Sequence, residues 1–258
     1  MLNVTQPKYG FYLLFCLLCT LLWITPAKAQ LGWGSRDTEG TYRGEIKVFM
    51  TDGSVRESDK VGLIMNAVRF GGIFSEDRVD AELVDHVEIV TNSGKQLYLA
   101  NFSITTTSQW GLFSVNGRRW LTRDFLSDRM QVWIFETTVY NADPNMGYGY
   151  SKQRTYFYQK DDGALRPLVP EAVMEDVADN EASLDLALKA KSTQTVSKVS
   201  GYLGAGLVVG SILVFFSDSI GDGAFVGMIG GAIVSIFTSW VTGLSVQKNL
   251  LQAVKAYQ

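Results

Sequence analysis

The spacing of hydrophobic residues changes along the chain and divides it into a β-type part and a helical part. From about Tyr42 to Tyr158, short runs rich in Val, Ile, Phe, Tyr and Thr alternate with turn residues, as in antiparallel sheets. Between Glu171 and Lys191, apolar residues recur every three or four positions, as on one face of a helix. Two long apolar runs follow. The pattern therefore predicts an α+β protein with its sheet first and its helices last.

Turn signals set the organisation of the β domain, which we expect over residues 30–168. Asp52-Gly53 separates two extended runs, and glycine supplies the positive φ that a tight hairpin turn needs. Comparable signals occur at residues 92–94, 116–117 and 161–163. With the run Gln131–Tyr140 they predict about eight or nine strands in a small antiparallel barrel or sandwich. Residues 141–150 are rich in turn formers and predict a surface loop.

Residues 169–196 predict a stalk helix that leads out of the β domain. Pro170 suits the first turn of a helix, because its missing N–H group is not needed there. Acidic residues cluster early in the segment Glu171–Lys191 and lysines cluster late, which complements the helix dipole. Ser192–Val196 is then expected to form a short polar link.

The Gly-rich segment 197–246 is expected to form a transmembrane helical hairpin. Its apolar runs, Gly201–Ser217 and Gly223–Val246, are long enough at ~1.5 Å per residue to cross or nearly cross a ~30 Å hydrocarbon core. Small residues at four-residue spacing, which continue as far as Gly243, allow close approach of another helix, so a homo-oligomer or an envelope protein partner is expected. The predicted helix-packing positions are Gly206, Gly210, Gly223, Gly227, Gly231 and Ser235. Residues 247–258 form a tail that extends the second helix or lies in the membrane interface, and the extension is favoured.

Residues 1–29 have the features of a secretory signal peptide. Lys8 precedes an apolar run, and Ala27-Lys28-Ala29 fits a small-x-small cleavage site. An uncleaved anchor is the alternative, although the apolar run is short for a span of ~20 residues. The β domain would therefore lie on the periplasmic or extracellular side of a cell-envelope membrane.

Cleavage after Ala29 removes both cysteines, Cys16 and Cys19, and leaves 21 basic and 26 acidic residues. A mature chain without cysteine has no disulfide, thiol nucleophile or cysteine-bound metal, and His86 is the single histidine of the sequence. Its net charge of −5 argues against nucleic-acid binding. We therefore expect no cofactor, no metal and no nucleic-acid partner.

The charges around the predicted hairpin conflict with export of the β domain. Export would place the loop containing Asp218 and Asp222 inside, with Lys198 and Lys248 outside, which is opposite to the positive-inside rule. A re-entrant hairpin, a helix pair buried in an oligomer and two Gly-rich helices in a soluble core therefore remain alternatives.

No constellation in the β domain specifies catalysis. His86 lies beside Asp85, but no nucleophile elbow accompanies it. The spacing of the densest acidic group matches no calcium loop and favours a solvated, partly self-paired face. This group comprises Glu76, Asp77, Asp80, Glu82, Asp85 and Glu88, with Arg78 among them. We therefore expect no enzymatic activity.

Arginines interleaved with tryptophans define a candidate ligand face for a glycan or peptide. Its residues are Trp110, Arg118, Arg119 and Trp120. The alternative is ordinary strand alternation, with the aromatic side chains turned inward and the arginines outward.

Several short motifs are similar to those of uncharacterised envelope proteins of Bacteroidota-type bacteria. They are Asp52-Gly53, the run 179–184 (DNEASL), the Gly-rich run from Gly201 and the run 253–257 (AVKAY). The resemblance implies an envelope location and supplies no activity to carry over, and the glycine repeat resembles glycine-zipper membrane segments, which implies helix packing. We therefore expect a non-enzymatic, membrane-anchored envelope protein that displays a β domain, with a glycan- or peptide-binding module as the alternative.

Overall fold

The computed structural model describes residues 40–107, 114–143, 147–215 and 222–257. The chain forms two compact units, of which the smaller comprises residues 1–35 and 139–151. That unit contributes only parts of two strands to the described residues, so the architecture below is that of the larger unit. The predicted signal peptide and Trp110 lie outside the described residues.

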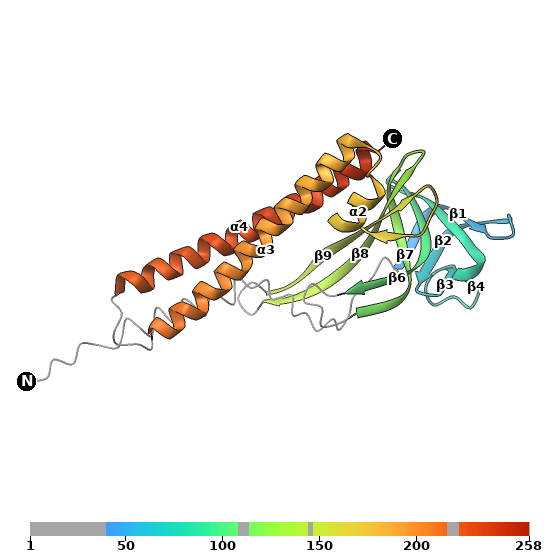
Figure 1. The fold of residues 1–258 in the computed structure, drawn as a ribbon. Helices are drawn as coiled ribbons and strands as arrows, with labels where there is room; N and C mark the ends of the chain where they lie inside the picture. The colour runs from blue at the N-terminus through green and yellow to red at the C-terminus, as the bar shows by residue number, and fades with distance from the viewer. Residues whose placement is uncertain (1–39, 108–113, 144–146, 216–221, 258) are drawn as a thin grey trace, which may run out of the picture. The chain divides into compact units, whose positions relative to one another are not determined.

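In the described ranges, ten strands form a single antiparallel sheet in the order β10-β9-β8-β7-β6-β5-β1-β2-β3-β4 (Figure 1). One half of the sheet comprises β1 (Gly40–Met50), β2 (Val55–Ile64), β3 (Ala67–Phe70), β4 (Arg78–Asp80) and β5 (Val84–Thr91), with a 3₁₀ turn at Ala81–Leu83. The other half comprises β6 (Gln96–Thr107), β7 (Ser114–Leu126), β8 (Met130–Asp143), β9 (Gly147–Lys160) and β10 (Arg166–Pro167). The α+β class and the antiparallel sheet are confirmed. The barrel or sandwich is not, because the described strands form one sheet with β4 and β10 at its edges.

Three of the four predicted hairpin turns are present. Gly53 has a φ of 84° between β1 and β2, and the preceding Asp52 accepts a hydrogen bond from the Ser54 backbone N–H. Gly94 has a φ of 78° between β5 and β6. In the turn between β9 and β10, the positive φ values fall on Asp161 and Asp162. Each turn thus places its tolerant residues where the backbone is left-handed.

Two sequence predictions about the strands are wrong. No turn lies at Asn116-Gly117, because these residues belong to β7 and pair with Thr105 and Ile104 of β6. The predicted loop 141–150 is mostly strand, because β8 continues to Asp143 and β9 begins at Gly147. Turn-forming residues therefore do not prevent long neighbouring strands from continuing when both have pairing partners.

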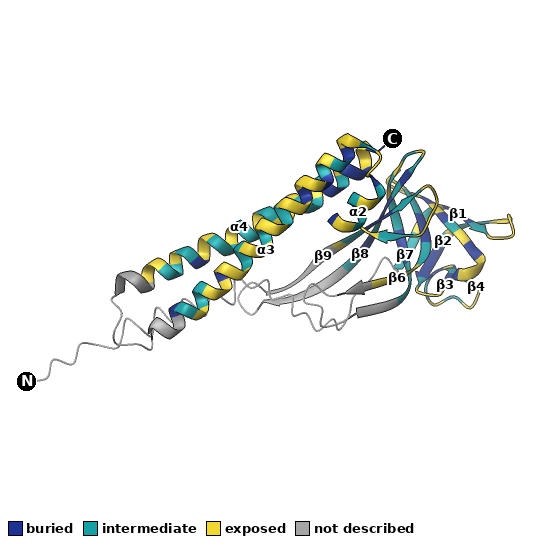
Figure 2. Cartoon of the chain, in the orientation of Figure 1, coloured by how far each residue is buried: buried dark blue, intermediate teal, exposed yellow. Residues whose placement is uncertain are grey.

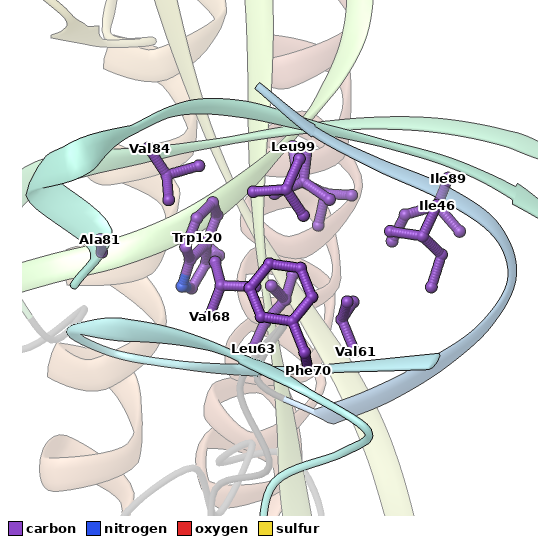
Figure 3. Close-up of a cluster of buried hydrophobic side chains, with 12 residues drawn as sticks. Ile46, Val61, Leu63, Val68, Phe70, Ala81, Val84, Ile89, Leu99 and Trp120 are labelled. Atoms are coloured by element: carbon purple, nitrogen blue, oxygen red, sulfur yellow. The ribbon is translucent and has the colours of Figure 1, made fainter. Parts of the chain in front are cut away.

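The larger core cluster lies on one face of the sheet and includes a fully buried tryptophan (Figure 3). Trp120 of β7 is 0% exposed, and its Nε1–H donates a 2.8 Å hydrogen bond to the backbone carbonyl of Ile64 at the end of β2. Because this bond joins strands far apart in the sheet order, the sheet curls around the cluster. The cluster comprises Ile46, Val48, Val61, Leu63, Val68, Phe70, Ala81, Val84, Val87, Ile89, Leu99 and Trp120.

The described part of the chain after the sheet contains three helices: α2 (Pro170–Asp176), α3 (Glu181–Phe215) and α4 (Asp222–Ala256). The predicted polar link Ser192–Val196 is wrong, because these residues lie within α3. Asn180 separates α2 from α3, and its side-chain oxygen accepts a hydrogen bond from the Ser183 N–H in the first turn of α3. The tail prediction is confirmed, because α4 runs without interruption to Ala256.

The sheet-proximal ends of α3 and α4 pack against β8, β9 and α2. This second core cluster comprises Met130, Val132, Tyr158, Val173, Val177, Ala187, Ala190, Leu250, Ala253, Val254 and Tyr257. Tyr257, the last described residue, is 1% exposed. The helices are therefore held to the β domain by a hydrophobic base.

Ion pairs and hydrogen bonds surround this base. The Tyr257 hydroxyl donates to Asp179 at 2.6 Å, and Arg129 and Lys160 each lie within 5 Å of the Tyr257 ring centroid. The hydrogen bond from Tyr257, with Lys160 and Arg129 nearby, lowers the pKa of the Asp179 carboxyl. The charged form of Asp179 is thus the form that holds the end of α4.

We expect docking of the α4 end to weaken only at acid pH. Because the folded-state pKa of Asp179 is lowered, its contribution is complete above the ordinary carboxyl pKa of ~3.9 and is lost as the pH falls through the lowered value. Hydrogen exchange of the 250–257 backbone should therefore be flat from neutral pH to about pH 5, after correction for intrinsic exchange rates. Asp179→Asn and Tyr257→Phe should each raise the exchange rate of this segment already at pH 7. The double variant should exchange no faster than Asp179→Asn alone. Independent, additive effects would contradict a single shared bond.

Candidate functional site

Helices α3 and α4 run antiparallel and pack along a seam of small residues (Figure 1). Near its middle, the Ser197 hydroxyl donates a 2.8 Å hydrogen bond to the backbone carbonyl of Ser239. A Cβ atom added at Gly204 would lie 2.7 Å from Cγ1 of Ile236, closer than real Cβ contacts. A Cβ added at Gly201 would lie 3.1 Å from the Ser239 hydroxyl. Glycine at these positions therefore permits the close approach of the two helices.

The seam follows a repeat of about 3.5 residues, the spacing of a left-handed coiled coil. Steps of three and four residues alternate on both helices. On α3 the repeat joins Ser183, Ala187, Ala190, Gln194, Ser197, Gly201, Gly204, Val208 and Ser211. On α4 it joins Ala232, Ile236, Ser239, Gly243, Val246, Leu250 and Ala253, and it ends at Tyr257, just beyond the helix. This repeat was not predicted, although its signal, alternating three- and four-residue steps between small or apolar residues, is present in both helices.

The predicted helix-packing residues fall on different sides of the pair. Gly231 faces Leu207, and Gly210 faces Met228 more loosely, with 3.8 Å from an added Cβ to the sulfur. Added Cβ atoms at Gly206 and Gly227 would meet nothing within 4 Å. Four residues exceed one full turn of a helix by about 40°, so a series with four-residue steps moves around the helix and leaves the seam after a few members.

The two remaining predicted positions are less informative. Ser235 is half-buried. Gly223 lies in the first turn of α4, but its surroundings are outside what the structure describes.

Away from the sheet, the helix pair has many exposed residues on its outer surface (Figure 2), and the large side chains among them are apolar. The exposed large apolar side chains are Val196, Val199, Tyr202, Leu203, Val209, Val226, Ile233, Val234, Phe237, Trp240, Val241 and Leu244. No charged residue occurs in residues 199–215 or 223–247. Among the described residues, one helical stretch, Val226–Ala256, is long and apolar enough to cross a membrane, and its most apolar 18 residues have a mean hydropathy of 1.6. The core helix of a soluble protein is mostly buried, whereas only 6% of the most apolar part of this helix is buried.

Three exposed aromatic residues lie at one level of the pair. Tyr202 and Trp240 are 77% and 61% exposed, and Phe237 contacts Trp240 with ring centroids 6.0 Å apart. The contacts Gly201–Ser239 and Gly204–Ile236 place these residues opposite one another along the two helices. We call Tyr202, Phe237 and Trp240 the aromatic belt. Tyrosine and tryptophan concentrate at the membrane–water interface, where a ring with a polar group is best accommodated.

The candidate ligand face does not form as predicted. Trp120 is in the core and cannot reach a surface ligand. The Arg118 guanidinium lies 3.3 Å from Oε1 of Glu82. The Arg119 guanidinium donates a hydrogen bond to the backbone carbonyl of its neighbour Arg118. Successive side chains of a strand point to opposite faces, so Trp120 and Arg119 could not have shared one surface.

The acidic group and His86 have ordinary partners. Arg56 pairs with Asp77, and His86 contacts Asp85 at 2.8 Å and stacks on Phe49 and Tyr98. Within the described ranges, no group of three or more His, Cys, Asp or Glu residues is arranged to hold a metal ion.

A basic hollow of about 690 Å³ lies between β1, β2 and the loop 71–75. Arg43 and Lys60 are paired across β1 and β2 and line its strand side. Gly62 lets the loop lie on β2, because an added Cβ would be 2.3 Å from the backbone nitrogen of Ile73. Phe74 stands at the rim and is 92% exposed. This hollow was not predicted from the sequence.

No protein-family model, curated protein or solved structure matches this chain.

Proposed function

We propose that this chain is a non-enzymatic, membrane-anchored cell-envelope protein in which a transmembrane pair formed by α3 and α4 carries the β domain. The observation that carries the proposal is the uncovered apolar surface of the pair, which has no charged residue in 199–215 or 223–247. Monomeric soluble proteins rarely expose an apolar patch of this extent. At ~1.5 Å per residue, α4 covers about 27 Å between Asp222 and Trp240, close to the ~30 Å hydrocarbon core.

The hydrophobic base supports a role in displaying the β domain. Ala187, Ala190 and Leu250 belong to one buried cluster with residues of β8 and β9, so the β domain would remain close to the membrane surface. Export by the predicted signal peptide would place it on the periplasmic or extracellular side. Protease treatment of intact cells, with detection of the full-length and cleaved chains, tests this location.

Membrane insertion should depend on the exposed side chains of α4. Val234 is 65% exposed, and an aspartate near the centre of a membrane helix costs about 2.5–3.5 kcal/mol. Val234→Asp should therefore move most of the processed chain from floating phosphatidylcholine vesicles to the aqueous fraction. Val55→Asp, the same change at an exposed position of β2, should not alter flotation. Recovery of the unaltered chain as a monomer in a detergent-free extract would refute the proposal.

Self-association is proposed to use the glycines that the seam leaves free. Gly206 and Gly227 meet nothing within 4 Å and can approach a second copy, whereas Gly231 contacts Leu207 within the pair. Gly206→Leu with Gly227→Leu should lower dimerisation in lipid about tenfold, or about 1.4 kcal/mol. Val209→Leu adds bulk to the same exposed surface without removing a glycine and serves as the control. Equal crosslinking yields for the unaltered chain, the double glycine variant and the Val209→Leu control would exclude association through these glycines.

A glycan- or peptide-binding β domain is the second candidate, favoured by the hollow that contains Arg43 and Lys60. The positive charges of Arg43 and Lys60 in this hollow would attract an acidic ligand. Titration of the full chain in detergent with an acidic oligosaccharide and an acidic peptide, compared with Arg43→Ala, tests this function. Binding that is unaffected by Arg43→Ala would exclude the hollow as the binding site.

A further inference from the structure

Lysines border the apolar part of the helix pair on the side of the sheet. We call Lys189, Lys191 and Lys198 of α3 and Lys248 of α4 the lysine collar. No acidic residue occurs in residues 186–215 of α3 or 223–256 of α4. On the side of the sheet, the charge next to the apolar surface is therefore of one sign on both helices.

The two collar lysines nearest the aromatic belt, Lys198 and Lys248, lie within side-chain reach of the level that lipid headgroups would occupy, and Lys191 and Lys189 lie farther toward the sheet. At ~1.5 Å per residue, Lys198 lies about 6 Å along the axis from Tyr202, and Lys248 about 12 Å from Trp240. The polar region of each leaflet is roughly 5–8 Å thick, and lysine side chains can extend along a helix to place their ammonium groups in it. If the aromatic belt marks the edge of the hydrocarbon, the nearest collar lysines reach the phosphates.

The collar lysines differ from the cations at the hydrophobic base in having no carboxylate partner. All four are exposed, and none lies within 4.0 Å of a carboxylate in the part of the chain that the structure describes. At the base, by contrast, Lys160 lies 3.7 Å from Asp179 and Lys255 lies 3.3 Å from Asp124. The counter-charge of the four collar lysines must therefore come from solvent ions or from another molecule.

We infer that the lysine collar binds the anionic headgroups of membrane lipids and holds the β domain against an anionic leaflet. This inference rests on the proposed membrane insertion of the helix pair. Charge complementarity and position beside the aromatic belt favour lipid headgroups as the source of the negative charge, because a second copy of the chain would add only the same lysines at this level. Each lysine near an anionic surface should strengthen binding about fivefold. Salt should weaken the effect, since the Debye length falls from ~10 Å at 0.1 M to ~3 Å at 1 M.

A competition between two vesicle populations tests the inference. The processed full chain is diluted from mild detergent into equal amounts of phosphatidylcholine vesicles and vesicles that also contain phosphatidylglycerol, which are then separated by density. We expect the chain to favour the anionic vesicles at least about tenfold at low salt. Lys198→Gln with Lys248→Gln should remove most of this preference. Lys47→Gln with Lys95→Gln changes the net charge equally within the β domain and should leave the preference intact.

The outcomes separate the inference from the proposed function. Insertion into both vesicle types without preference would overturn the lysine collar as a lipid site and leave membrane anchoring standing. A preference that survives the Lys198 and Lys248 changes would also overturn it, because another part of the chain would then select the lipid. Failure to insert into either vesicle type would overturn the anchoring proposal and the inference with it.

Discussion

Trp120→Ala should lower the free energy of unfolding of the β domain by about 3–5 kcal/mol. The side chain is fully buried within the larger core cluster, and its removal leaves a cavity. It also removes the Nε1–H donor of the Ile64 carbonyl, which joins β7 to the end of β2. Denaturant unfolding of the full chain in detergent, followed by near-ultraviolet circular dichroism, measures the change.

Two variants make the interpretation of Trp120 specific. Trp120→Phe keeps much of the volume and loses the hydrogen bond, so its effect should be clearly smaller. Leu126→Ala, at a 55% exposed position of the same strand, should change stability by no more than about 0.5 kcal/mol. If Trp120→Ala were as mild as Leu126→Ala, the residue would not be the centre of this core.

Gly204→Leu and Gly206→Leu should have opposite consequences although they lie two residues apart on α3. At Gly204 an added Cβ would be 2.7 Å from Cγ1 of Ile236 and 3.3 Å from its backbone nitrogen, so the helices must move apart. Overpacking of this kind costs about 1–3 kcal/mol or more. At Gly206 nothing lies within 4 Å, and leucine improves helix propensity by up to about 1 kcal/mol.

An engineered disulfide can report this difference. The Ser197 and Ser239 hydroxyl oxygens are 3.4 Å apart, so Ser197→Cys with Ser239→Cys should oxidise readily within one chain. Substitution of Cys16 and Cys19 by serine removes background thiols. Disulfide formation should be slowed by Gly204→Leu and unchanged by Gly206→Leu. Equal yields would show that the seam does not depend on glycine at position 204.

Local signals were sufficient where a conformation depends on a few neighbouring residues. Asp52-Gly53 and residues 161–163 predicted turns correctly, because left-handed φ values favour those residue types wherever they occur. Asn116-Gly117 shows the limit of such signals. There the pairing of β7 with β6 extends through the glycine, since ladder hydrogen bonds on a long strand outweigh a local turn preference.

The candidate site was only partly predictable. Glycines and serines at close spacing indicated tight helix packing, and the small-residue seam of α3 and α4 agrees with that general expectation. Which glycines face the seam depends on the rotation of each helix, and a four-residue series drifts by about 40° at each step. Gly201 and Gly204 were therefore missed, and Gly206 and Gly227 turned out to face outward.

Trp120 illustrates a different limit. A tryptophan between arginines fits a ligand face and a core strand equally well, because strand alternation puts one side chain on each surface in turn. Only the curl of the sheet, which brings the Ile64 carbonyl to the indole, decides that Trp120 is inside.

The sequence by itself determined the class of the protein, the order of sheet and helices, and the long uncharged segments at residues 199–215 and 223–247. Composition and short-range spacing are properties of the chain alone, so these conclusions needed no contacts. The tertiary structure decided the single sheet, the burial of Trp120, the hydrophobic base that binds α3 and α4 to β8 and β9, and the faces on which the glycines lie. Each of these depends on residues distant in sequence that meet only when the chain has folded, and hydrophobic periodicity carries no information about which face meets which partner.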